Sequence, residues 1–318
     1  MREAIGRLSP SIGRVVTYHL GWIDAAGEPV DNPGGKVVRP ALAFASARAI
    51  GAPARAALPG AVAVELVHNF SLLHDDVMDR DVERRHRPTA WALMGEGEAI
   101  LAGDALLAMA QEELIVPPSP ERLRAAAALS MATAEMITGQ AEDLAFERRQ
   151  DVGSDECIAM LEHKTAALIS CACKVGAILG GGTDEQVGAL GDFGHALGLA
   201  FQAVDDILGI WGEPETTGKQ TWSDLRRHKK TLPVVAALEN GGPAVGELRR
   251  LLVSESSSEG DIALAARLVE ENGGRDRALE VAARSLGLAL SHLGMIETHP
   301  AGRQELEEIA GFITARDF

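Results

Sequence analysis

The sequence is poor in aromatic residues, which make up 4% of its 318 positions and include a single tyrosine. Alanine, leucine and valine instead carry most of an apolar fraction of 46%. Such a mixture favours closely packed helices over a β-sandwich, because a sandwich draws more heavily on aromatic and β-branched residues. The sequence also shows no strand-turn-strand series and no repeat period. We therefore predict an all-α protein that forms one domain over residues 1–318.

Cysteine is scarce as well. Cys157, Cys171 and Cys173 are too few for a disulfide framework and have no companion ligands at zinc-site spacing. We expect all three to be small buried residues. The N-terminal MREAIGRLSP lacks the apolar stretch of a signal peptide, and no segment approaches a membrane-spanning run. We therefore expect a cytoplasmic protein without a transmembrane segment.

Positive charge is in deficit, since the formal net charge is −16. A nucleic-acid surface needs lysine and arginine clustered over a whole face, so this composition argues against that class of function. The basic residues that are present gather at 84–87 and 226–230, each time shortly after an acidic pair. Any phosphate binding is therefore expected to be local.

Helix boundaries are marked by proline near helix starts and by glycine or proline after helix ends. The segments predicted to be helical are about 59–81, 121–149, 154–179, 184–211 and 232–239, followed by two or three more. Gly191, Gly194 and Gly198 lie inside the fourth of these, where each costs roughly 1 kcal/mol relative to alanine, so we expect a close helix approach there. The polar segment 212–231 and the Ser-rich segment 254–260 are predicted loops.

The most informative segment is LLHDDVMDRDVERR at 72–85. On a helix, Asp79 lies one turn beyond both Asp75 and Asp76, so the three carboxylates share one region of surface. Like charges placed in this way repel one another. A hard divalent cation such as Mg²⁺ removes the conflict, because it takes oxygen ligands from one or two carboxylates and from substrate phosphates.

A second acidic pair, Asp205 and Asp206, lies within the apolar segment FQAVDDILGIW at 201–211, with Gln202 one turn earlier. A lone acidic pair at a helix end is usually solvated. Two pairs inside apolar runs, each followed by a basic cluster, are hard to explain as ordinary surface. If the two helices face each other, their carboxylates can surround the mouth of a cavity and hold several metal ions around one diphosphate.

These two segments resemble the aspartate-rich motifs of the trans-isoprenyl diphosphate synthase, or polyprenyl synthetase, family. Other family signatures follow in order along nearly the whole chain, namely GGKVVRP at 34–40, ELVHNFSLLHDD at 65–76, HKTAAL at 163–168 and TGKQTWSDLRRHKKTLP at 217–233. Each is weak alone, but their joint order is specific. The resemblance implies the isoprenoid synthase fold, with about ten or more helices around a central elongated active-site cavity. It also implies a prenyltransferase that joins isopentenyl diphosphate to an allylic diphosphate.

The resemblance further implies a role for each matching residue. The expected metal ligands are Asp75, Asp76, Asp79, Asp205 and Asp206, which would hold about three Mg²⁺ ions, replaceable by Mn²⁺. The residues expected to bind the allylic substrate are Arg84, Lys164, Thr165, Phe201, Gln202, Lys219 and Lys229. Those expected to anchor isopentenyl diphosphate without metal are Lys36, Arg39, His68 and Arg85. Arg84, Lys164 and Lys219 would join the aspartates in catalysis, because neutralising the leaving diphosphate favours ionisation. A homodimer is also implied.

Product length in this family depends on the bulk four or five residues before the first motif, and those positions hold Ser71 and Phe70. We predict that they form the floor of the substrate tunnel and give a short-chain product of geranylgeranyl type. Three positions depart from the family pattern. Gly209 replaces a third aspartate, His228 a frequent glycine, and Val37 a frequent basic residue. Loss of the carboxylate at 209 is expected to weaken an outer contact to the metal site.

Two other functions stay open at this point. A terpene cyclase of the same fold would need the metal site but no isopentenyl anchor, so Lys36, Arg39, His68 and Arg85 favour the synthase. A non-catalytic subunit that sets the product length of another synthase would be expected to lose metal carboxylates. The first motif here is intact, which again favours an enzyme.

Overall fold

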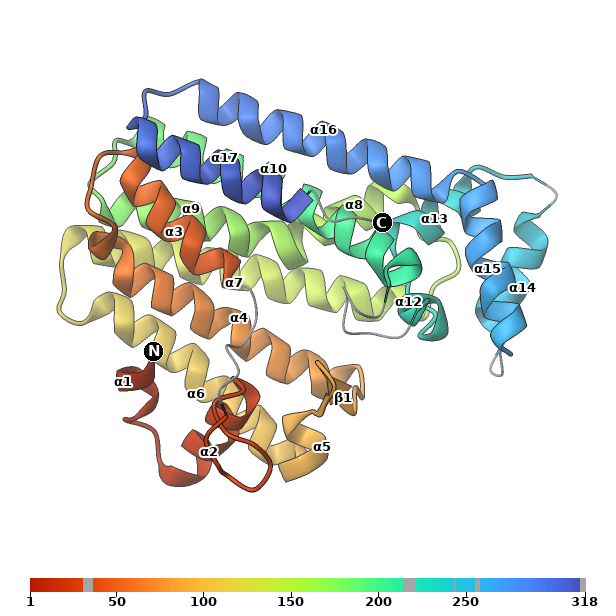
Figure 1. The fold of residues 1–318 in the computed structure, drawn as a ribbon, viewed down its shortest axis with the longest axis horizontal. Coiled ribbons are helices and arrows are strands. Elements are labelled where there is room, and N and C mark those ends of the chain that lie inside the picture. Colours follow the sequence, from red (N-terminus) through yellow and green to blue (C-terminus); the bar gives the residue numbers. More distant parts are fainter. Residues whose placement is uncertain (31–36, 214–220, 243, 255–257, 315–318) are drawn as a thin grey trace. The chain divides into compact units, whose positions relative to one another are not determined.

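A computed structural model describes residues 1–30, 37–213, 221–242, 244–254 and 258–314 of the protein, and the regular structure of these residues is almost entirely helical (Figure 1). The elements are α1 (Arg2–Ile5), α2 (Pro10–His19), α3 (Val38–Ala49), η1 (Ala54–Ala57), α4 (Leu58–Met78), β1 (Glu83–Arg84), β2 (Arg87–Pro88), α5 (Ala90–Met94), α6 (Glu96–Ile115), α7 (Pro120–Phe146), α8 (Ser154–Leu161), η2 (Glu162–Ala166), α9 (Ala167–Leu179), α10 (Asp184–Trp211), α12 (Ser223–Arg226), α13 (Leu232–Glu239), α14 (Val245–Val253), α15 (Glu259–Glu271), α16 (Gly274–Gly294) and α17 (Pro300–Thr314). The predicted all-α class is confirmed.

The chain divides into two compact units, each assembled from several stretches of sequence. The first comprises residues 1–131, 171–190 and 297–306, and the second comprises residues 132–170, 191–296 and 307–318. Each unit is described by itself below. The single domain expected from the sequence stays a prediction.

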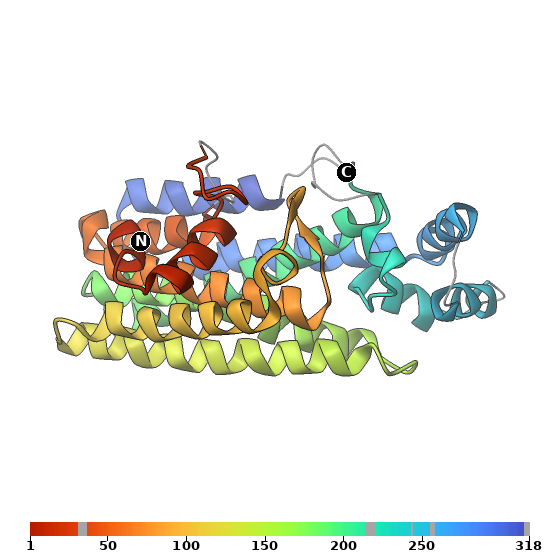
Figure 2. The ribbon, with the colours of Figure 1, turned by 90° about the horizontal axis from the view of Figure 1, so that it is seen from below.

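The first unit is built around α4, which lies beside α3 and α6 (Figures 1 and 2). A proline is tolerated in its first turn because the N–H that proline lacks would have no intrahelical partner there. Glycine lets α6 approach α4 closely, since a Cβ built on Gly103 would lie 2.3 Å from Nε2 of His74. The helix ends at Met78 with Asp79 as its C-cap. The first acidic motif therefore lies at the carboxyl end of a buried helix.

A short hairpin follows α4, and it is too small to form the strand-turn-strand series that the sequence lacks. Strands β1 and β2 pair antiparallel. The two residues between them, Arg85 and His86, have φ angles of 53° and 59°. A two-residue turn with both φ angles positive is of type I′, and such turns usually contain asparagine or glycine. The hairpin could not be predicted from the sequence, because its turn contains neither asparagine nor glycine.

In the second unit, helices α7 and α10 approach the turn η2 closely. A Cβ built on Gly139 of α7 would lie 2.3 Å from the backbone nitrogen of Lys164, and one built on Gly198 of α10 would lie 2.6 Å from Cα of Ala166. The close approach predicted at Gly198 is thereby confirmed. The turn η2 is a π-helical turn that separates α8 from α9, where the sequence predicted one continuous helix. Such turns are frequent at functional sites.

Helix boundaries elsewhere agree closely with the sequence. The helices predicted at 184–211 and 232–239 coincide with α10 and α13. The segment predicted as a loop at 212–231 contains the short helix α12, while residues 214–220 of it lie outside the described part. Residues 255–257 of the Ser-rich segment are also outside it, and α15 begins after this segment's Ser258, whose hydroxyl accepts a hydrogen bond from the N–H of Asp261 at 3.2 Å.

All three cysteines are buried, as predicted, and none forms a disulfide. Burial raises the pKa of the Cys173 thiol to about 12, which keeps it protonated and unreactive. The expectation about membrane-spanning runs needs correction, because the stretch Ala54–Met78 is long and apolar enough to cross a membrane. In the structure 61% of its most apolar window is buried inside the protein, as for the core helix of a folded domain.

Candidate active site

The first acidic motif places its three aspartates at the carboxyl end of α4. Asp76 is almost fully buried, whereas Asp75 and Asp79 are half-buried. The N–H of Asp79 donates to the carbonyl of Asp75 at 2.8 Å and closes the last turn. The three carboxylates therefore come from one turn of helix, as the sequence predicted.

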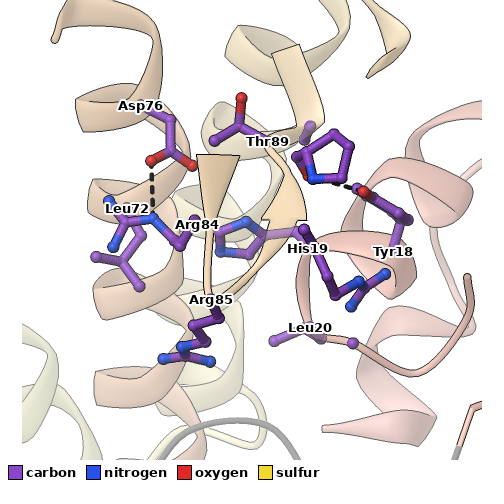
Figure 3. Close-up of a pocket in the computed structure, with 12 residues that line it drawn as sticks. Tyr18, His19, Leu20, Leu72, Asp76, Arg84, Arg85 and Thr89 are labelled. Atoms are coloured by element: carbon purple, nitrogen blue, oxygen red, sulfur yellow. Dashed lines mark hydrogen bonds and ion pairs between the residues drawn. The ribbon is translucent and has the colours of Figure 1, made fainter. Parts of the chain in front are cut away.

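Asp76 is held by the hairpin and is only partly satisfied. Its Oδ1 accepts a hydrogen bond from Nε of Arg84 at 2.7 Å (Figure 3). Its Oδ2 is buried and has no hydrogen-bond partner. Burial raises the pKa of Asp76 to about 6, the Arg84 guanidinium opposes this shift, and Asp81 and Asp75 add to it. A buried carboxylate oxygen without a donor is costly, and an added cation would relieve that cost.

His19, Arg84 and Arg85 line one cavity together with Asp76. His68 and Arg39 interact electrostatically with these basic side chains, and we call the group of five, Arg39, His68, Arg84, Arg85 and His19, the anion pocket. Burial is the main cause of the lowered pKa of His68, and all four other members lower it further. The pKa of His19 is lowered to about 3, first by burial and then by the neighbouring arginines. Nε of Arg39 is buried without a partner. The three arginines outnumber the carboxylates beside them, Glu65 and Asp76, while the histidines are neutral, so the cluster suits an added anion.

Helix α2 fixes the hairpin that carries the two arginines. The hydroxyl of Tyr18 donates to the carbonyl of Pro88 at 2.7 Å (Figure 3). Arg87 stacks over the ring of Tyr18, with 4.5 Å between its guanidinium carbon and the ring centroid, and donates to the carbonyl of Ile23 at 2.8 Å. Figure 3 shows His19, the last residue of α2, reaching toward Arg84 between α2 and α4. The positions of Arg84 and Arg85 thus depend on a helix far away in the sequence.

In the second unit the turn η2 presents two basic side chains to α7. Nζ of Lys164 donates to Asp143 at 2.5 Å, and Nδ1 of His163 lies 2.9 Å from Oε2 of Glu142. The amide of Gln140, one turn before Asp143, is buried, and neither its nitrogen nor its oxygen has a partner. Lys164 is therefore positioned by an acidic partner, next to an amide that can still bind a polar group.

A chain of hydrogen bonds joins η2 to the second acidic motif. The hydroxyl of Thr165 donates to Gln202 at 2.8 Å, and Gln202 donates to Oδ1 of Asp206 at 2.9 Å. Oδ2 of Asp206 accepts the N–H of Leu232, the first residue of α13, at 3.0 Å. Burial raises the pKa of Asp206 to about 7, against the two hydrogen bonds and with help from Asp224 and Asp205. Since protein donors engage both oxygens, Asp206 is better suited to positioning than to direct metal binding.

The predicted residues fall into two groups. One group lies in the first unit and comprises Arg39, His68, Phe70, Ser71, Asp75, Asp76, Asp79, Arg84 and Arg85. The other lies in the second unit and comprises Lys164, Thr165, Phe201, Gln202, Asp205, Asp206 and Lys229. Lys36 and Lys219 lie outside the described residues. Within each unit, the structure shows residues of separate motifs in one place, as for Asp76 with Arg84 and Thr165 with Gln202.

Several residues of these clusters were not predicted from the sequence. His19 had no signal, because nothing in the spacing of α2 relates it to α4. Asp143 and Gln140 lie in a predicted helix, ITGQAEDLAF at 137–146. The available hint was their spacing of one helical turn, which places the carboxylate and the amide on the same side of that helix. Asn69 donates to the carbonyl and the carboxylate of Glu65, at 2.8 and 3.2 Å, and so holds the acidic neighbour of the anion pocket.

The donor set at the first motif suits a divalent cation that takes only some of its ligands from the protein. Among the residues that the structure describes, no three or more His, Cys, Asp and Glu side chains are grouped to hold a metal ion. Mg²⁺ needs only one or two carboxylates and completes its shell with waters and substrate phosphates. The buried Oδ2 of Asp76, beside half-buried Asp75 and Asp79, fits such an incomplete site.

Comparison with known proteins gives a consistent picture. The Polyprenyl synthetase family model matches residues 21–269. The chain is 49% identical to a (2E,6E)-farnesyl diphosphate synthase of Mycobacterium tuberculosis over 99% of its own length and 89% of that protein. It is 42% identical to a geranylgeranyl diphosphate synthase of the same organism, over 92% and 84% of the two chains. The crystal structure of a polyprenyl synthetase from Streptomyces coelicolor superposes with a TM-score of 0.95, at 48% identity and over 99% and 95% of the two chains.

Proposed function

The chain belongs to the polyprenyl synthetase family and is a trans-prenyl diphosphate synthase, a prenyltransferase, and we propose that it condenses isopentenyl diphosphate with dimethylallyl, geranyl or farnesyl diphosphate. The observation that carries the proposal is the junction of Asp76 with the anion pocket. A buried carboxylate with one oxygen lacking a donor lies against Arg84, and a cluster of arginine and histidine side chains lies next to it. The carboxylate of Asp76 suits a cation, and the basic cluster suits an anion.

The allylic diphosphate is assigned to the metal side of this junction. Asp75, Asp76, Asp79 and Asp205 are the proposed ligands of Mg²⁺, which when bound neutralises charge on the leaving diphosphate. The residues proposed to bind the same substrate are Arg84, Lys164, Thr165, Phe201, Gln202, Lys219 and Lys229. The Asp143 carboxylate holds the Lys164 ammonium in place before substrate arrives. A preset charge adds more to ionisation than one that must first be ordered.

Isopentenyl diphosphate is assigned to the anion pocket, with Lys36, Arg39, His68 and Arg85 as its ligands. Arginine forks bind phosphate oxygens through two parallel N–H groups, and the unpartnered Nε of Arg39 supplies such a donor. His68 is neutral, because burial and four basic neighbours lower its pKa. It can therefore donate one N–H without adding to the repulsion among the arginines. No protein base is assigned, since the released diphosphate can accept the proton lost after coupling.

Product length is the finer part of the proposal. We propose geranylgeranyl diphosphate as the main product, with farnesyl diphosphate as a second candidate favoured by the similarity to the Mycobacterium tuberculosis farnesyl diphosphate synthase. Phe70 is 7% exposed and packs edge-on against His74, with 4.8 Å between ring centroids. The Nε2 of His74 in turn lies 3.0 Å from the carbonyl of Ile100 on α6. We propose that the Phe70 ring, held by these contacts, closes the end of the substrate tunnel and so limits product length.

Product analysis with each of the three allylic starters tests this function. Incorporation of labelled isopentenyl diphosphate is expected with Mg²⁺, and removal of metal by a chelator should abolish it. Phe70→Ala should lengthen the products, while Phe312→Ala, at an exposed phenylalanine of α17, should leave them unchanged. Unchanged products from Phe70→Ala would remove this residue from the floor. Failure to incorporate isopentenyl diphosphate would overturn the synthase assignment itself. The homodimer and the cytoplasmic location expected from the sequence stay predictions.

A further inference from the structure

A buried amide in α7, that of Gln140, forms no hydrogen bond within the protein. The residue is 9% exposed, and among the residues that the structure describes neither its Nε2 nor its Oε1 has a partner. A side-chain amide has two N–H donors and an oxygen that can accept two hydrogen bonds. Folded proteins rarely leave such a group buried and unpaired, because folding removes its hydrogen bonds to water and nothing replaces them. The amide of Gln140 therefore needs a partner that the chain itself does not supply.

Gln140 lies beside the turn η2. Its neighbour Gly139 packs against this turn, since a Cβ built there would lie 2.3 Å from the backbone nitrogen of Lys164. Asp143, one helical turn after Gln140, accepts a hydrogen bond from Nζ of Lys164 at 2.5 Å. Side chains three residues apart on a helix are neighbours, with about 5–6 Å between their Cβ atoms. The amide of Gln140 is therefore close to the Lys164 ammonium, a proposed ligand of the allylic diphosphate.

A second glutamine contacts η2 from α10 and provides a comparison. Gln202 accepts a hydrogen bond from the hydroxyl of Thr165 at 2.8 Å, and its Nε2 donates to Asp206 at 2.9 Å. Both polar atoms of Gln202 thus have protein partners before any ligand binds. Gln202 joins α10 to η2, whereas the hydrogen-bonding capacity of Gln140 is unused within the protein.

The charges around Gln140 favour a diphosphate oxygen as its partner. Lys164 has three N–H donors, and one of them binds Asp143, which holds the ammonium in place. An anion at this ammonium is within the same region as the N–H groups of Gln140. Hydrogen bonds to an anion are stronger than those between neutral groups. A neutral amide also adds a donor without adding charge beside Lys164.

From this geometry we infer that Gln140 is a further substrate-binding residue. Its Nε2 donates a hydrogen bond to a diphosphate oxygen of the allylic substrate, next to the contact made by Lys164. The inference deepens the proposed function and rests on it. It also has a consequence for the free protein, since a buried amide without a partner lowers stability until the ligand binds.

Gln140→Met tests the inference, because methionine has a similar length and shape but no amide. Calorimetric titration with inorganic diphosphate in the presence of Mg²⁺ measures binding without turnover. The dissociation constant should rise at least about tenfold, as expected for the loss of one hydrogen bond to a charged group. The ligand-free variant should melt at the native temperature or above it, because the change removes a buried polar group that has no partner. Gln304→Met, at an exposed glutamine of α17, is the matched control and should bind diphosphate as the native protein does.

Steady-state kinetics give a second readout. In Gln140→Met the KM for geranyl diphosphate should rise by a similar factor, while the KM for isopentenyl diphosphate stays native. Native diphosphate binding in this variant would overturn the inference, as would an equal rise of both KM values. A lower melting temperature would also overturn it, since the amide would then stabilise the fold, for example through a buried water molecule. The function itself is judged separately, by incorporation of isopentenyl diphosphate in the native protein.

Discussion

Gly139→Ala is a small change that should damage both the fold and the reaction. Gly139 is buried in α7, and a Cβ there would lie 2.3 Å from the backbone nitrogen and 2.6 Å from Cα of Lys164. No side-chain rotation can relieve a contact with backbone atoms. Either α7 or the turn η2 must move, and η2 carries both Lys164 and Thr165.

The magnitude follows from two opposing effects. Alanine stabilises a helix interior by about 1 kcal/mol relative to glycine. Forcing an extra carbon into a packed site costs about 1–3 kcal/mol. Gly188→Ala, in α10, isolates the first effect, because nothing lies within 4 Å of a Cβ built there. The two variants should therefore differ in free energy of unfolding by about 1–3 kcal/mol, with Gly139→Ala the less stable.

Urea unfolding and steady-state kinetics measure the two consequences. A displacement of 1 Å at a reacting group can reduce rate by about 100-fold, so kcat/KM of Gly139→Ala should fall by at least about tenfold while that of Gly188→Ala stays native. Equal stabilities for the two variants would refute the claim that α7 and η2 are packed too closely to accommodate a Cβ at position 139. A stability loss with native kcat/KM would refute the link between this packing and Lys164.

Two further predictions concern buried titratable groups. The pKa of His19 is lowered from 6.5 to about 3, so the unfolded chain binds a proton that the fold excludes. The contribution of His19 to the free energy of unfolding is therefore complete above pH 6.5. It falls as the pH drops, and about 2 kcal/mol is lost at pH 5. Urea unfolding at pH 7 and 5 should show a smaller acid loss for His19→Gln than for the native protein or for His299→Gln, at an exposed histidine; identical losses would contradict this. Asp206→Ala removes the acceptor for Gln202 and Leu232, whereas Asp206→Asn can keep the chain if the amide of Gln202 turns over. Thermal unfolding should find the alanine variant about 1–3 kcal/mol less stable than the asparagine variant, and equal stabilities would argue against the chain.

The helices could be predicted because their ends are marked locally. Proline near the start and glycine after the end delimit α10 and α13, and both agree with the sequence prediction. The hairpin after α4 could not be predicted in this way, because Arg85 and His86 hold a turn that normally uses asparagine and glycine. Contacts from Tyr18 and Arg87 replace the missing local preference. Tertiary structure imposes that turn.

The candidate site likewise contains residues that local spacing identifies and residues that only the tertiary structure brings together. Spacing along one helix identified Asp75, Asp76 and Asp79, because helical periodicity is a property of the sequence. His19 and Asp224 enter their clusters from other elements, and no local rule relates His19 to α4 or Asp224 to Gly209. From the sequence alone, Gly209 could be described only as the loss of a carboxylate. In the structure, the carboxylate of Asp224 occupies the space that a side chain at this position would need.

Backbone strain marks the same regions. Among the described residues, the positive φ angles at positions other than glycine occur at Val37, Arg80, Arg85, His86, Trp222 and His228. Val37, Arg80, His86 and His228 each adjoin a predicted substrate or metal residue, Arg85 is itself one, and none of the six positions lies within a long helix. A left-handed conformation costs such a residue roughly 1–2 kcal/mol, so selection for stability alone would favour glycine at these positions. Side chains kept there despite it indicate that their placement matters more than the strain, which is the pattern expected where a protein gives up stability to hold charged groups ready for substrate.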